Sequence, residues 1–265
     1  MPLPLSVALS AATLIALFSA VWLWQLRSQN AGMIDPVWAF GLALVAILTA
    51  LTGTGAPSNR LLIAIGGTLW GLRLAHHLWQ RNFGHPEDAR YRQFRDQWGT
   101  AAPSRFFWFF QLQALVALIL AIAFFVPAFR PEPVAAPDAI AAIAIWLVSV
   151  IGEGVADRQL ARFTANRQNK GEVCRTGLWR YSRHPNYFFE CLHWFAYTAL
   201  AIRLPWGWLT LIPPFVMAWL LMKLSGIPLL EARLIHTRPG YDDYIRTTSA
   251  LIPWPPRRSP PAGPR

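Results

Sequence analysis

No charged side chain interrupts residues 1–26, MPLPLSVALSAATLIALFSAVWLWQL. A helix needs about 20 mostly apolar residues to cross the hydrocarbon core of a bilayer. Residues 36–59 and 106–129 are also free of charge over such a length. A cleaved signal peptide would have a Lys or Arg ahead of a shorter apolar run, and residues 1–26 have no such residue. The sequence therefore predicts a retained first helix and an all-α polytopic membrane protein.

The composition of the chain supports the same class. Hydrophobic residues make up 54% of it and charged residues 14%, whereas soluble domains average about 25% charged residues. This balance excludes a water-soluble globular protein. The apolar runs predict about seven membrane-spanning helices. We place them at Pro4–Gln25, Met33–Leu51, Leu61–Gln80, Phe106–Val126, Ile140–Leu160, Pro185–Ile202 and Trp206–Leu224.

The basic residues are distributed unevenly across this seven-span arrangement. Of the 24 Lys and Arg residues, only Arg60, Arg130 and Arg203 fall on one side. Because positive charge is retained in the cytoplasm, we expect an outer N-terminus and a cytoplasmic C-terminus. We expect residues 1–252 to form a single membrane domain, and the Pro- and Arg-rich residues 253–265 to form a disordered tail. The chemistry should then lie at the cytoplasmic ends of the helices.

The two cysteines and the net charge of +11 narrow the possible partners. Cys174 and Cys191 lie in or beside the most basic segment, which we place on the reducing side, so neither a disulfide nor a metal site is expected. The basic residues are scattered between apolar spans and form no nucleic-acid motif. Anionic lipid headgroups and an anionic cofactor are the expected partners, and the oligomeric state stays open.

Polar side chains gather at the ends of the third and fifth predicted spans. Arg73, His76 or His77, Gln80 and Arg81 fall on one helical stripe of the third span, and Glu153 and Asp157 are one turn apart on the fifth. Ionisable groups at such depth generally face a bundle interior or a wet cavity. Two interpretations stay open, a ligand site and a structural ion-pair network between the two spans.

The segment richest in polar and aromatic residues is 169–190, NKGEVCRTGLWRYSRHPNYFFE. Pro185 suits the first turn of a helix, which would put Asn186 and Glu190 on one inward face. Arg180, Arg183 and His184 would then lie at the positive end of that helix, where backbone donors and guanidinium groups can bind phosphate. Ordinary cytoplasmic charge would explain the arginines, but not Asn186 and Glu190 within the membrane.

Several motifs resemble the C-terminal domain of the steroid 5-alpha-reductase family, and more closely a bacterial branch of it, the DUF1295 group. Residues 183–190, RHPNYFFE, follow residues 177–182, GLWRYS, in the pattern of that family. The resemblance extends to residues 70–74 with 81–82, 87–91, 156–160, 226–231 and 238–241. It implies a seven-helix fold that holds NADPH in a cytoplasmic-facing cavity formed mainly by residues 140–252, and a multi-pass protein of a bacterial inner membrane.

Carried over by motif, the resemblance implies that Asp157, Asn186 and Glu190 contact the cofactor, with Arg180, Arg183 and Tyr187 beside them. The basic and acidic residues around these motifs complete the expected cofactor-binding set. They are Arg162, Lys170, His184, Glu231 and Arg233.

Two features depart from the family pattern. Relatives commonly have a small residue before the motif glutamate, where this chain has Phe189, which would either narrow the cofactor groove or face lipid. The glutamate and tyrosine that hold the steroid carbonyl in the animal enzymes have no secure counterpart. Asp35 and Tyr91 are the candidates, although Asp35 could instead cap a helix and Tyr91 could anchor the chain at the membrane surface.

The sequence leaves three functions to consider. The leading hypothesis is an NADPH-dependent reductase that delivers hydride to an activated C=C bond of the enone type in a lipid-like, steroid-like or isoprenoid-like substrate, with Tyr91 or a protonated Asp35 stabilising the carbonyl oxygen. An isoprenylcysteine-type carboxyl methyltransferase that uses S-adenosylmethionine is the alternative, because such enzymes also carry an Arg-His-Pro-x-Tyr motif; Glu231 and Arg233 could serve it. A transporter lacks support, because no inverted halves or charged midplane site are visible.

Overall fold

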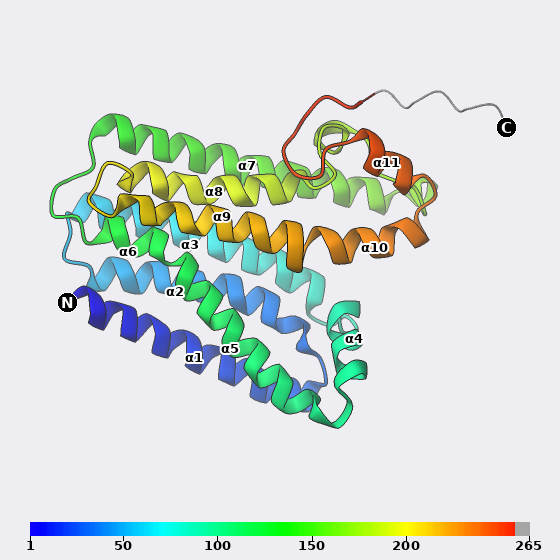
Figure 1. The fold of residues 1–265 in the computed structure, drawn as a ribbon, viewed down its shortest axis with the longest axis horizontal. Helices are drawn as coiled ribbons and strands as arrows, with labels where there is room; N and C mark the ends of the chain where they lie inside the picture. Colours follow the sequence, from blue (N-terminus) through cyan, green and yellow to red (C-terminus); the bar gives the residue numbers. More distant parts are fainter. Residues whose placement is uncertain (258–265) are drawn as a thin grey trace. The chain divides into compact units, whose positions relative to one another are not determined.

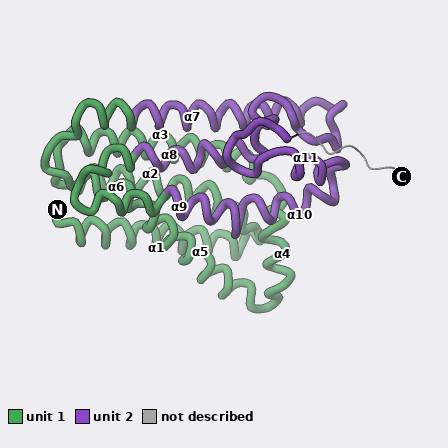
Figure 2. The backbone as a smooth tube through the Cα atoms, turned by 45° about the horizontal axis from the view of Figure 1, so that its top comes forward, with its two compact units in different colours: residues 1–142, 197–213 green, residues 143–196, 214–265 purple. Residues whose placement is uncertain are grey.

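The computed structural model describes residues 1–257 and is built from helices (Figure 1). Within those residues, the pairing of extended segments is limited to an isolated parallel bridge between Ser182 and Ser249. The chain divides into two compact units (Figure 2). Unit 1 comprises residues 1–142 and 197–213, and unit 2 comprises residues 143–196 and the chain from 214 onward. The all-α class is confirmed.

Unit 1 holds the N-terminal helices. They are α1 Leu3–Ser28, α2 Ile34–Thr52, α3 Pro57–Asn82, α4 Ala89–Trp98, α5 Ala102–Leu120 and α6 Ile122–Ala128. Helix α2 packs along α3, and α1 packs against both α5 and α2. The contact between α2 and α3 is close at Gly71, where a methyl group would collide with the carbonyl oxygen of Ala39. Small residues allow such backbone approach in membrane helices, where van der Waals packing drives association.

The remaining helices follow in the second half of the chain. They are α7 Ala136–Ala165, α8 Pro185–Ala201, α9 Ile212–Trp219, α10 Ile227–Thr237 and α11 Tyr241–Thr247. Helix α8 begins at Pro185, as its fixed backbone angle predicts. A π-helical turn, Leu220–Leu224, follows α9 directly. Unit 2 therefore carries the whole motif-rich segment together with α10 and α11.

Six stretches of the described residues are long and apolar enough to cross a membrane. They are Leu3–Ser28, Ala31–Thr52, Pro57–Asn82, Ala89–Ala128, Ala136–Ala165 and Gly207–Thr237. The sixth predicted span, Pro185–Ile202, is not among these stretches; it corresponds to α8, which has 17 residues. Large apolar side chains such as Leu23, Ile140 and Ile151 are exposed along these helices, which suits lipid rather than water. The chain is a multi-pass integral membrane protein, and its orientation stays a prediction.

The Pro- and Arg-rich tail expected at residues 253–265 is described as far as Arg257. The backbone N–H of Trp254 donates to the carbonyl of Tyr181 at 2.9 Å, and that of Arg257 donates to the carbonyl of Thr247 at 2.8 Å. These two bonds hold the first part of the tail against unit 2. Residues 258–265, the rest of the predicted disordered segment, lie outside the described residues.

Candidate functional site

Unit 1 brings the two candidate catalytic residues into contact. The Tyr91 hydroxyl donates to Asp35 Oδ1 at 2.5 Å, and Arg90 Nη2 donates to Asp35 Oδ2 at 2.9 Å. Arg81 Nη2 lies 3.7 Å from the same carboxylate, while Asp88 pairs with Arg90. We call these five residues the Asp35 cluster. It joins the start of α2 to α4, so residues 55 and 56 positions apart in the sequence meet.

Local contacts fix α4 in this position. The Asp88 side chain caps the helix by accepting from the Arg90 backbone N–H at 3.0 Å. Burial acts to raise the pKa of Asp88, but the hydrogen bonds and charge of Arg90 outweigh it and lower that pKa below its ordinary value. Glu87 accepts from the Ala31 N–H at 2.7 Å and from Arg95 Nη2 at 2.8 Å. The side chains of Glu87 and Asp88 therefore hold α4 in place.

The contacts of Asp35 decide which member of the pair can offer a proton. Both carboxylate oxygens of Asp35 accept from donors, one from a phenol and one from a guanidinium. Such charge-assisted bonds suit an ionised carboxylate, which is an acceptor alone. The buried Tyr91 hydroxyl is then the proton donor of the pair. Of the two acids considered from the sequence, the geometry favours Tyr91.

Unit 2 brings together polar motif residues on α7 and α8. Asn186 Nδ2 donates to Asp157 Oδ1 at 3.2 Å, and Asn186 Oδ1 accepts from the Tyr187 backbone N–H at 3.0 Å. Asn186, Asp157 and Tyr187 are half-buried, and Glu190, one turn further along α8, is buried. We call these four residues the Asn186 cluster. The inward face expected for Asn186 and Glu190 therefore lies beside α7 at Asp157.

The preceding loop is docked on α7 by its own motif. The Trp179 indole N–H donates to the carbonyl of Ala156 at 3.0 Å, and the Leu178 N–H donates to Gln159 Oε1 at 2.9 Å. Gly177 has a positive φ of 59° and lies against the Gln159 side chain, so a larger residue would be strained and crowded. The Gly-Leu-Trp motif thus sets the position of α8 relative to α7 within unit 2.

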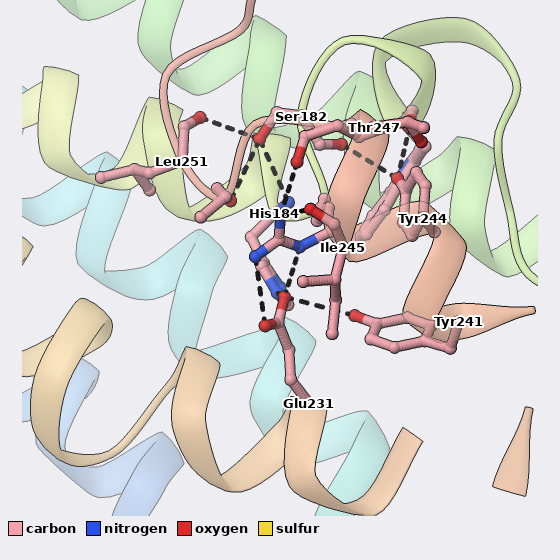
Figure 3. A network of polar contacts seen from close by, with 12 residues as sticks. Ser182, His184, Glu231, Tyr241, Tyr244, Ile245, Thr247 and Leu251 are labelled. Carbon is pink, nitrogen blue, oxygen red and sulfur yellow. Dashed lines mark hydrogen bonds and ion pairs between the residues drawn. The ribbon is translucent and has the colours of Figure 1, made fainter. Parts of the chain in front are cut away.

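Figure 3 shows a polar network of unit 2 around His184, Glu231 and Ile245. Arg183 makes the bonds that link Glu231 and Ile245. Its Nε and Nη2 donate to the two carboxylate oxygens of Glu231 at 2.6 and 3.2 Å, a bidentate ion pair. Its Nη1 donates to the carbonyls of Ile245 and Thr248. His184 Nε2 lies 3.0 Å from Glu231 Oε1. This network, which we call the Arg183 network, ties the motif loop to α10 and α11.

Two tyrosines of α11 complete the network. The Tyr241 hydroxyl lies 3.5 Å from Glu231 Oε1, and the Tyr244 hydroxyl donates to the carbonyls of Trp179 and Ser182. Burial first, and then the Glu231 carboxylate, raise the pKa of Tyr241, so its phenol stays protonated at neutral pH. Burial likewise raises the pKa of Tyr244. Both tyrosines therefore act as donors that hold α11 in place.

This arrangement separates the predicted cofactor residues into three groups. Asp157, Asn186, Tyr187 and Glu190 form the Asn186 cluster. Arg183, His184 and Glu231 bond to one another, and their assignment to a cofactor stays a prediction. The other four predicted residues are exposed. Arg180 lines a pocket with Arg175 and Arg257, and the side chains of Arg162, Lys170 and Arg233 make no hydrogen bond or ion pair within residues 1–257.

Sequence reasoning missed several residues that organise these sites. Arg90 was counted only as one of the cytoplasmic charges. No sequence spacing predicts its ion pair with Asp35, because the two residues are 55 positions apart. Tyr241 stands in the Arg-Pro-Gly-Tyr motif of residues 238–241, which could have marked it as buried and bonded. Tyr244 and Arg175 had no signal beyond their residue types.

Phe189, the departure from the family pattern, packs against α7. A methyl group added to Gly152 would lie closer to the Phe189 ring than van der Waals contact allows. We therefore expect Gly152→Ala to lower the free energy of unfolding in detergent by about 1–3 kcal/mol, the usual cost of overpacking. In a Phe189→Ala background, where the space is vacant, the same substitution should change that free energy little.

Gly154→Ala is the matched control on the same helix. A methyl group there would meet only Arg158 Nη2, at an ordinary distance of 3.5 Å. Equal losses for Gly152→Ala with and without the Phe189 ring would show that this ring is not what Gly152 accommodates.

Comparison with known proteins places this chain in one family. A family model described as a protein of unknown function (DUF1295) matches residues 21–248. This match covers every helix from the end of α1 to α11 and both polar clusters. Neither a curated protein nor a solved structure matches the chain.

Proposed function

The chain belongs to the DUF1295 family, and from that premise we propose that it is an NADPH-dependent membrane reductase of activated C=C bonds. The observation that carries the proposal is the hydrogen bond between Asn186 and Asp157, with buried Glu190 one turn away. These are the residues that the resemblance to the steroid 5-alpha-reductase C-terminal domain assigns to the cofactor. The proposed substrate is lipid-like, of steroid or isoprenoid character, and the proposed location is a bacterial inner membrane.

The chemistry of the Asn186 cluster fits a nicotinamide nucleotide. Such a cofactor offers a carboxamide and ribose hydroxyls, which need neutral amide partners and carboxylate acceptors. Asn186 supplies the amide, Asp157 and Glu190 supply carboxylates, and the Tyr187 ring adds an aromatic face beside His184, whose ring it stacks on at 5.3 Å. When bound, NADPH supplies the hydride that adds to the β-carbon of the substrate. The cluster's part is to orient the cofactor.

Hydride addition to an enone builds negative charge on the carbonyl oxygen, and a positioned acid stabilises that charge. We assign this role to Tyr91. Its single O–H proton, donated to Asp35 in the resting protein, turns to the carbonyl oxygen when substrate is bound. Asp35 keeps its ion pair with Arg90. The apolar substrate enters from the bilayer, which dissolves it.

Thermal or chemical unfolding in detergent, with and without NADPH, tests the proposal. At NADPH equal to 100 times its Kd, the wild-type protein should gain about 2.7 kcal/mol by mass action. A hundredfold weaker Kd would reduce this gain to about 0.4 kcal/mol. We expect Asn186→Ala and Glu190→Gln each to show that reduced gain, while the free energy of unfolding without nucleotide changes by about 1 kcal/mol or less.

Two exposed residues of the same unit provide matched controls. Asn166→Ala and Glu172→Gln make the same chemical changes outside the cluster, and the full NADPH gain should persist in both. A large loss of stability without nucleotide, together with an intact NADPH gain, would assign Asn186 and Glu190 to a structural network. A gain with S-adenosylmethionine and none with NADPH would favour the methyltransferase.

A further inference from the structure

A small pocket in unit 2 lies outside both the Asn186 cluster and the Arg183 network. It has a volume of about 230 Å³, and its lining includes three arginines, Arg175, Arg180 and Arg257. We call it the arginine pocket. Its volume exceeds the roughly 30 Å³ share of one water several-fold, so a tetrahedral oxyanion has room there. The hydroxyl-bearing residues Thr247 and Thr248 also line it.

The charges of the arginine pocket are not balanced by protein. Arg175 Nη1 pairs with Asp243 Oδ2 at 3.0 Å, and its Nη2 donates to the carbonyl of Gly240 at 2.6 Å. Asp243 is the acidic residue of the lining. Within residues 1–257, the guanidinium groups of Arg180 and Arg257 have no acidic partner and donate to no protein acceptor. Two positive charges thus remain for an anion, and guanidinium forks suit phosphate oxygens.

The backbone holds the two uncompensated arginines near each other. Arg257 is tied to α11 by its N–H bond to the carbonyl of Thr247 at 2.8 Å. Residue 181, next to Arg180, accepts from the Trp254 N–H at 2.9 Å. The Arg175 guanidinium lies 5.3 Å from the centre of the Tyr244 ring, which is buried. These contacts connect the backbone next to Arg180 and at Arg257 to unit 2 and place the Arg175 side chain against Tyr244.

Apolar side chains beside the arginine pocket indicate where its ligand comes from. Trp254 and Ile252, shortly before Arg257, are 67% and 64% exposed, and Tyr181, next to Arg180, is 42% exposed. Exposed Trp and Tyr side by side with arginines are typical of segments that lie at a membrane surface, where the rings enter the headgroup layer. A phosphate dissolved in water would leave these apolar side chains without a partner.

We propose that the arginine pocket binds the phosphate group of an anionic membrane lipid, while Trp254 and Ile252 enter the headgroup region beside it. The pocket anchors the segment after α11 to the membrane surface. This assignment is independent of the reductase proposal, because it uses none of the residues of the Asn186 cluster. It also gives Arg180 a ligand other than the cofactor expected from the motif.

Titration of phosphatidylglycerol into the full-length protein in a neutral detergent, with bound lipid counted by native mass spectrometry, tests the proposal. The double variant Arg180→Gln/Arg257→Gln should bind this lipid about ten- to a hundredfold more weakly than the wild-type protein, because it loses charge-assisted contacts. Phosphatidylcholine with the same acyl chains should bind equally weakly to both. Both substituted side chains are exposed, so the double variant should fold.

Arg158→Gln/Arg167→Gln removes the same charge from exposed positions of unit 2 outside the pocket and should bind phosphatidylglycerol like the wild-type protein. An equal loss in this control would overturn the proposal in favour of general electrostatics. Displacement of the lipid by inorganic phosphate at equal concentration would assign the pocket to a free anion. Displacement by NADPH but not by NADH would assign it to the nucleotide's extra phosphate.

Discussion

Arg183→Met should lower the free energy of unfolding, measured in detergent without nucleotide, by about 3–5 kcal/mol. The substitution leaves the Glu231 carboxylate without its bidentate partner, and the Glu231 side chain is only 12% exposed. It also removes the donors to the carbonyls of Ile245 and Thr248. A buried charge left without a partner is among the costliest single changes in a protein.

A double-mutant cycle separates this effect from a simple loss of packing. Glu231→Gln in the Arg183→Met background removes the stranded charge, so the double variant should be less destabilised than the sum of the two single variants. Arg162→Met, an exposed arginine in the same unit, is the control and should cost little. If Arg183→Met leaves stability without nucleotide unchanged and abolishes NADPH binding, Arg183 is a cofactor ligand, as the motif first indicated.

Tyr91→Phe should lower the turnover number by about 100- to 10,000-fold, the usual contribution of a positioned acid. The variant removes the one proton that the Asp35 cluster can offer to a carbonyl oxygen, and it leaves the ring packed against Phe109 at 6.2 Å. NADPH oxidation with a long-chain α,β-unsaturated ketone measures the loss. NADPH affinity should be unchanged, because the cofactor residues proposed here belong to the Asn186 cluster.

Tyr181→Phe provides the control, because this tyrosine is exposed and belongs to neither the Asp35 cluster nor the Asn186 cluster. Asp35→Asn keeps the shape of the acceptor but removes its charge, so we expect a smaller loss of turnover than for Tyr91→Phe. Full activity of Tyr91→Phe, with a loss of stability alone, would make the pair a structural tie between α2 and α4.

The parts of the fold that depend on neighbouring residues could be predicted from the sequence. Charge-free runs set the membrane class, and the fixed angle of Pro185 set the start of α8. The short helices α4 and α11 were missed, because ten and seven residues with mixed polarity carry no span signal. Their positions depend on side-chain bonds such as those of Tyr91 to Asp35 and of Tyr244 to Ser182, which connect distant segments.

The sequence predicted which residues belong to the candidate sites, but not which residues they contact. The sequence indicated Asn186 and Glu190 correctly as one face of α8, because helical spacing is local. Whether Arg183 faces a phosphate or a carboxylate depends on Glu231, 48 positions away. A guanidinium group binds both ligands with the same fork. The comparison with the family suggested Tyr91 and Asp35 only as separate candidates, and neither charge nor periodicity predicted the contact between them.

The identity of any nucleotide that the protein retains tests the central claim most directly. The wild-type protein and the variants Asn186→Ala and Asn166→Ala would be purified in mild detergent and their bound small molecules identified by mass. NADPH or its oxidised form should accompany the wild-type protein and Asn166→Ala, and should be depleted from Asn186→Ala. S-adenosylmethionine or its demethylated product in place of the nicotinamide nucleotide would contradict the assignment of this protein as a reductase.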